Sequence, residues 1–309
     1  MVLGMTAAAA DEAAVSRGEY LFRAAACASC HTDVEQRGGF IAGGREMATQ
    51  FGTFRVPNIT PDPETGLGDW QLDDFRKAMI DGLRPDGNPY YPVFPYRWYT
   101  GMTEQDVADL WAYLQSVEPV RNPVADHQLN FPFSIRSLLW GWRLLNFDSA
   151  ETVHDDNRSD AWNRGAYLVN HLGHCGACHT PTDALGGFQS DDRFLAGSTQ
   201  IPGIHPAPNI TPDSKTGLGD WRDADIVRAL KRAITPRGTP IRGPMAEYVE
   251  YGSSYLTDDD LNAMATYLKS LPAVFRATEP SRYVTGREHQ GSEGVRSLIA
   301  SGDNLTRAK

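Results

Sequence analysis

The sequence predicts an all-α protein of two tandem domains with long ordered loops, and three observations lead to this prediction. The chain has 309 residues, which at about 150 residues per domain suggests two globular units. Residues 56–79 and 207–230 are identical at 14 of 24 positions, at an offset of 151. Apolar residues recur at helical spacing, whereas the Gly- and Pro-rich stretches between them show little strand alternation. The chain therefore contains two copies of one helical unit.

The repeat and the changes in composition predict four segments. An N-terminal domain is expected over 11–118, a linker with an amphipathic helix over 119–158, and a C-terminal domain over 159–275. The residues 276–309 are polar and unpatterned and are expected to form a tail. The linker helix is expected to clamp the two domains together, and a helix lying on a membrane surface is the alternative.

Each half is expected to contain three short helices. The first leads into a cysteine motif. The second follows the repeated Gly-Leu-Gly-Asp-Trp, where Asp69 and Asp220 are the expected N-caps. The third starts at Thr103 and at Thr257, each followed three residues later by an acidic residue, as in a capping box.

Charge and hydropathy restrict the partners. Asp and Glu number 39 against 29 Lys and Arg, a formal net charge of -10 that would repel nucleic acid. The same field would attract a dissociable partner that carries a basic patch. The longest apolar stretch, about 131–147, is interrupted by Pro, Gly and Arg and is too short to cross a bilayer, so no integral membrane segment is expected.

All four cysteines fall in two motifs, Cys27-Ala28-Ser29-Cys30-His31 and Cys175-Gly176-Ala177-Cys178-His179. Cys-x-x-Cys-His is the signature of covalent c-type haem attachment, in which two sulfurs bond to the porphyrin and the adjacent His binds iron. A redox-active cysteine pair and half of a zinc site are the alternatives. Zinc would require pairs 148 residues apart to converge on one ion. Two covalently attached haem c groups are therefore the favoured interpretation, each forming the core of a small domain.

The second axial ligand decides what each iron can do, because Met raises the potential and blocks the site, whereas an open position permits chemistry. The candidate in the second half is Met245, ahead of the last helix. The parallel loop of the first half, 91–102, ends in Met102 just before the helix cap. For both, the alternative is a Met of the core. His171 and His174 are expected to point outward or toward a haem propionate.

At these motifs the sequence resembles the family of periplasmic dihaem and trihaem cytochromes c that includes the cytochrome subunits of membrane-linked alcohol and aldehyde dehydrogenases. The resemblance covers nearly the whole chain, including the repeated NITPD and TGLGDW, PFSIRSLLWGW and GPMAEYVE. It implies two class I-like cytochrome c domains, His31 and His179 as proximal ligands, and Met245 as a distal ligand. In many alcohol dehydrogenase cytochrome subunits the first distal Met stands where this chain has Phe94. Dihaem members with a similar loop use the later Met, which here is Met102.

The resemblance and the motifs predict a dihaem c-type cytochrome. It would relay electrons from a dehydrogenase to a downstream cytochrome or oxidase and transform no substrate. Because haem attachment needs the periplasmic maturation machinery, a periplasmic location is expected, with peripheral membrane association left open. The alternative is a dihaem cytochrome c peroxidase-like enzyme with an open N-terminal haem. Phe94, at the position where many relatives have the distal Met, is the reason to retain this alternative. Against that alternative, the first half shows no Glu or His with a clear distal role, and the two halves resemble each other closely.

Overall fold

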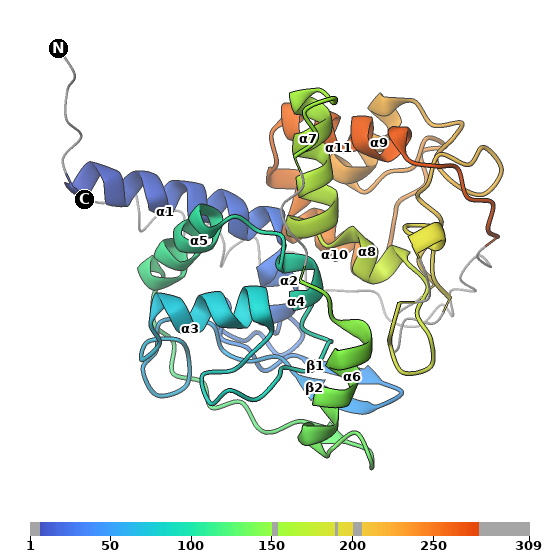
Figure 1. Cartoon of the computed structure of the whole chain (residues 1–309). Coiled ribbons are helices and arrows are strands. Elements are labelled where there is room, and N and C mark those ends of the chain that lie inside the picture. Colours follow the sequence, from blue (N-terminus) through green and yellow to red (C-terminus); the bar gives the residue numbers. More distant parts are fainter. Residues whose placement is uncertain (1–6, 150–153, 189–190, 200–205, 278–309) are drawn as a thin grey trace.

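A computed structural model describes residues 7–149, 154–188, 191–199 and 206–277. Figure 1 shows two mainly helical halves side by side, the first in blue to green and the second in yellow-green to orange. From residue 278 onward, the predicted polar tail lies outside the described residues.

The first half is built from short helices joined by long loops. Helix α1 (Ala7–Ala24) leads into the short α2 (Cys27–His31). After a loop come α3 (Leu72–Arg76), its continuation as a π-helical turn η1 (Lys77–Asp81), the single turn α4 (Tyr96–Tyr99), and α5 (Glu104–Ser116).

The second half repeats this order. Helix α7 (Asp160–Tyr167) continues as a π-helical turn η3 (Leu168–Leu172) and leads into α8 (Cys175–His179). A 3-10 turn η4 (Asp191–Arg193), α9 (Asp223–Arg232), α10 (Pro244–Tyr251), a 3-10 turn η5 (Ser253–Tyr255) and α11 (Asp258–Ser270) follow.

In each half the first helix packs closely against the last, α1 against α5 and α7 against α11 (Figure 1). Glycine permits this approach. A Cβ added to Gly18 would lie 1.9 Å from the carbonyl oxygen of Asp109, and one added to Gly165 would lie 2.0 Å from that of Ala263. Around the crossings, large apolar side chains such as Phe22 and Leu261 are fully buried. The same backbone contact therefore determines the helix spacing in both halves.

The threonine caps of the last helices are as predicted, and the caps of the middle helices are not. The Thr103 and Thr257 hydroxyls accept hydrogen bonds from the backbone N–H three residues on. The capping box is only half formed, because the Thr103 and Thr257 backbone N–H groups donate to tyrosine hydroxyls of the other half and not to an acidic side chain. The predictions for Asp69 and Asp220 are wrong, because α3 is capped by Gln71 and α9 by Arg222. The Gly-Asp-Trp segment ends directly before the N-cap residue, and the acidic residue that completes each capping box lies inside the helix.

The first half also contains a small antiparallel sheet, which the all-α prediction missed. Strand β1 (Glu46–Thr49) pairs with β2 (Gly52–Arg55), with Glu46 opposite Arg55, and β2 pairs with β3 (Gln128–Leu129). The strands are only two to four residues long, too short to show an alternating pattern. The fold is therefore mostly helical, with a three-stranded sheet on the first half.

Within the predicted linker, a 3-10 turn η2 (Arg136–Leu138) runs into α6 (Leu139–Asn146). This segment touches both halves. The Phe147 ring lies 5.4 Å from the Tyr96 ring of the first half, and the Trp142 Nε1–H donates to the Leu185 carbonyl of the second at 3.0 Å. Among the described residues, no helix combines the length and the apolar character needed to span a bilayer.

Candidate haem sites

The two Cys-x-x-Cys-His motifs fold in the same way. Each forms one short helix that begins at its first Cys and ends at its His. The residue before each helix has a left-handed backbone, with φ of 49° at Ala26 and 38° at His174. Because residues three apart lie on the same side of a helix, both cysteines of a motif can present their sulfurs to one edge of a planar group.

Each motif His is oriented by a proline carbonyl. His31 Nδ1 lies 2.8 Å from the carbonyl oxygen of Pro57, and His179 Nδ1 lies 2.8 Å from that of Pro208. A carbonyl only accepts, so Nδ1 carries the proton and Nε2 keeps its lone pair for a metal. Burial lowers the pKa of His31 to about 4 and also lowers that of His179, which keeps both rings neutral. Neutral imidazoles with a fixed tautomer suit iron ligation.

The cysteine side chains are better suited to thioether bonds with a haem than to a redox-active pair or a zinc site. Burial raises the pKa of the Cys27 and Cys175 thiols to about 12, unlike the lowered value of a redox-active cysteine pair. Cys30 is accessible, although burial raises its pKa too. No group of three or more His, Cys, Asp or Glu side chains in the described part of the chain could hold a metal ion, which disfavours zinc.

The two candidate distal methionines occupy different places. Met245 is in the first turn of α10, just after Gly243 (φ 64°), and is half-buried against the core. Met102 is 5% exposed, immediately before the cap of α5. Counted from the two capping threonines, the residue equivalent to Met102 is Leu256, which is buried. Ligation by Met102 thus has no parallel in the second half, and both ligations stay predictions.

His171 and His174 do not point outward, because both contact the first half, and an approach to a haem propionate stays a prediction. His171 Nδ1 lies 2.9 Å from the Trp98 carbonyl oxygen, and His174 Nε2 lies 3.3 Å from that of Ala25. Burial lowers the pKa of both rings. These two histidines therefore belong to the contact between the halves.

Several residues around the motifs carried no sequence signal. Arg45 donates to the carbonyl of Ser29, inside the first motif, and pairs with Glu247 of α10 at 2.8 Å. Tyr99 and Tyr248 are so deeply placed that burial raises the pKa of each phenol well above its usual value. In the sequence these residues are an isolated Arg in a loop and two aromatic residues on short helices, and no local pattern links them to the motifs. Only the fold shows that they lie near the motifs.

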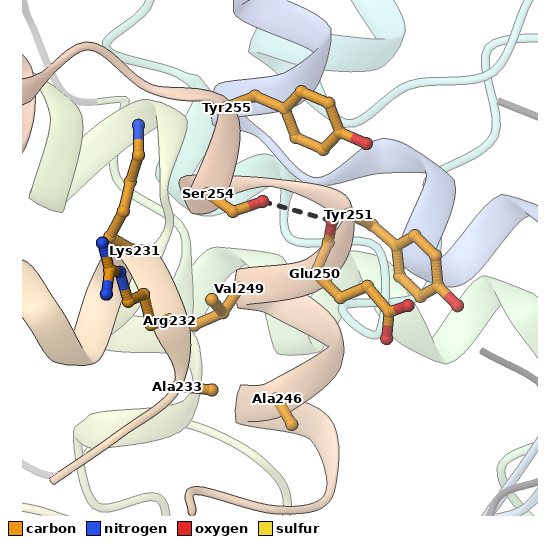
Figure 2. A pocket seen from close by; sticks show the side chains of 9 residues that line it. All are labelled: Lys231, Arg232, Ala233, Ala246, Val249, Glu250, Tyr251, Ser254 and Tyr255. Carbon is orange, nitrogen blue, oxygen red and sulfur yellow. Dashed lines mark hydrogen bonds between the residues drawn. The ribbon is translucent and has the colours of Figure 1, made fainter. Parts of the chain in front are cut away.

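A cavity of about 480 Å³ lies between α9, α10 and η5 (Figure 2). Its walls include Lys231, Arg232 and Tyr255, and the Ser254 hydroxyl donates to the Glu250 carbonyl at 3.4 Å beside it. None of the eight predicted haem-binding residues lines this cavity.

The cytochrome c family model matches residues 15–118 and 163–272, and each match contains one Cys-x-x-Cys-His motif. The chain belongs to the cytochrome c family. It is 42% identical over 262 residues to a dihaem c-type cytochrome of Cereibacter sphaeroides, which covers 84% of this chain and 86% of the relative. The two matches and this relative show that this cytochrome c carries two covalently attached haem c groups, as predicted.

Other relatives of this cytochrome c are longer. It is 41% identical over 288 residues to the fructose dehydrogenase cytochrome subunit of Gluconobacter japonicus, over 93% of this chain and 58% of the relative. It is 39% identical over 272 residues to the cytochrome c subunit of the quinone alcohol dehydrogenase of Gluconobacter oxydans. This match covers 86% of this chain and 56% of that subunit. The chain thus spans under three fifths of these two subunits. The predicted resemblance is confirmed, and the protein is an electron-transfer cytochrome.

Proposed function

We propose that this dihaem cytochrome c accepts electrons from a dehydrogenase and passes them to another cytochrome or an oxidase in the periplasm, and that it transforms no substrate. Relatives that are named as cytochrome subunits of fructose and alcohol dehydrogenases support a dehydrogenase as donor. The acidic net charge of -10 favours an acceptor with a basic docking patch.

The observation that carries this proposal is the equivalence of the two histidines. His31 and His179 each meet a proline carbonyl at 2.8 Å, in the same position of the repeat. Two sites prepared alike on the proximal side suit a relay. The contrast with a peroxidase, which needs one open distal face, rests on Met102 and Met245. The proposed domains are 11–118 and 159–275, joined by the linker 119–158.

Within this proposal, the side chains hold and tune the group while the haem supplies an iron that alternates between the ferric and ferrous states. Cys27, Cys30, Cys175 and Cys178 would bond to the porphyrins, and His31 and His179 would bind the irons. Met102 and Met245 would be the second ligands of the irons and would raise the potentials. Because Nδ1 of each His already holds its proton against a proline carbonyl, neither ring would have to gain or lose a proton in order to bind iron.

The test is ligand replacement with a spectroscopic readout. Met245→Ala should remove the weak far-red band of one methionine-bound ferric haem, while a pyridine haemochrome assay still counts two haems. Met102→Ala should remove the remaining band. Met264→Ala, which truncates a fully buried Met of α11, is the control for packing and should leave both bands in place.

Two outcomes would contradict the proposal. If the unmodified protein shows the band of only one Met-bound haem together with peroxide turnover, the first haem is open and the protein is an enzyme. If a purified periplasmic dehydrogenase and its substrate fail to reduce the protein at any salt concentration, the donor is of another class.

A further inference from the structure

The contact between the two halves is reciprocal. The Tyr20 hydroxyl, on α1, donates to the Asp260 carboxylate of α11 at 2.6 Å and accepts from the Thr257 backbone N–H at 3.1 Å. The Tyr167 hydroxyl, on α7, donates to the Asp106 carboxylate of α5 and accepts from the Thr103 N–H at 3.3 Å. The first helix of each half thus binds the capped N-terminus of the last helix of the other.

These tyrosines lie on the helices that carry the haem motifs. Tyr20 precedes Cys27 by seven residues, and Tyr167 precedes Cys175 by eight. Only α1, or α7 with η3, separates each hydroxyl from its motif. A shift of either tyrosine relative to the other half would therefore shift a haem attachment site as well.

The motifs themselves meet across the same interface. Trp98 of α4 packs so closely on the second motif that a Cβ on Gly176 would lie 2.1 Å from its ring. The Tyr248 hydroxyl of α10 donates to the Ala24 carbonyl at 3.5 Å, and the ion pair between Arg45 and Glu247 spans the same boundary. The two haem attachment motifs therefore lie near the same contact between the halves.

We propose that Tyr20 and Tyr167 are positioning residues that hold the two haem sites in register, so that an electron passes directly from one haem to the other within the chain. In this step one iron is oxidised from Fe(II) to Fe(III) and the other is reduced from Fe(III) to Fe(II). No bond breaks and no proton is transferred, so no further reactant is needed. This inference extends the proposed relay, since it specifies how the two haems act as one unit.

The experiment measures electron exchange between the haems in Tyr20→Phe, Tyr167→Phe and the double variant of the holoprotein. A reducing pulse too small to reduce both haems is followed by time-resolved absorption. The double variant should redistribute the electron at least about threefold more slowly, because hydrogen bonds to charged groups hold the docked arrangement. The dipolar coupling between the two ferric haems, measured by electron paramagnetic resonance, should weaken in parallel.

The matched control is Tyr91→Phe. It removes a buried phenol that donates to the Phe133 carbonyl at 2.9 Å, away from this interface, and should change neither readout. An unchanged exchange rate in the double variant would overturn the inference, as would an equal slowing in Tyr91→Phe. If the double variant fails to mature, the single variants decide by the same criteria. The pulse requires no dehydrogenase, so failure of the proposed donor would leave this result intact.

Discussion

Replacing Gly165 with Ala tests the helix crossing of the second half. The new Cβ would lie 2.0 Å from the Ala263 carbonyl oxygen, whereas real Cβ atoms essentially never come within 3.0 Å of a neighbour. Helices α7 and α11 would have to separate by about 1 Å, and both atoms that clash are held by helical backbone. We take the upper end of the cost of overpacking, about 3 kcal/mol. Better helix propensity of Ala returns about 1 kcal/mol, so the net loss is about 2 kcal/mol.

Thermal unfolding of the holoprotein, followed by circular dichroism, measures this loss. For a chain of 309 residues a loss of about 1 kcal/mol lowers Tm by about 1.5 °C, so Gly165→Ala should lower Tm by about 3 °C. Gly141→Ala is the matched control, because Gly141 lies in α6 with open space around it, and the same propensity gain should leave Tm unchanged or raise it. If Gly165→Ala is as stable as Gly141→Ala, the close crossing is not what limits side-chain size at this position.

Two further predictions concern the contact between the halves. Arg45→Gln should destabilise the protein more than Glu247→Gln, because Arg45 also donates to the Ser29 carbonyl. A double-mutant cycle, measured by urea unfolding, should give a coupling free energy of about 1 kcal/mol for this partly exposed ion pair. Burial lowers the pKa of His171 below its ordinary 6.5, and this effect outweighs the smaller rise caused by the Trp98 carbonyl. Below about pH 6.5, His171 therefore binds a proton in the unfolded chain more readily than in the folded chain. Stability should therefore fall as pH drops below 6.5, and the fall should be shallower in His171→Gln; equal slopes in the two proteins would contradict this assignment.

The features that could be predicted from sequence were local or repeated. The Cys-x-x-Cys-His motifs, the order of helices and the caps at Thr103 and Thr257 depend on residues within a few positions of one another. The three-stranded sheet was missed because strands of two to four residues carry no period. Tyr20 was noticed only as part of the repeat, because its partner Asp260 lies 240 residues away and no local pattern links them. Asp69 misled because an acid beside a glycine turn resembles a cap.

The reciprocal tyrosine contacts have the form of an isologous interface, in which residue i of one copy meets residue j of the other and j meets i. Two separate copies of such a half would have to find each other in solution, and their pairing would depend on concentration. Here the segment 117–159 joins them, so the pairing is intramolecular and does not depend on concentration. A covalent dimer of this kind remains a two-haem unit at any dilution.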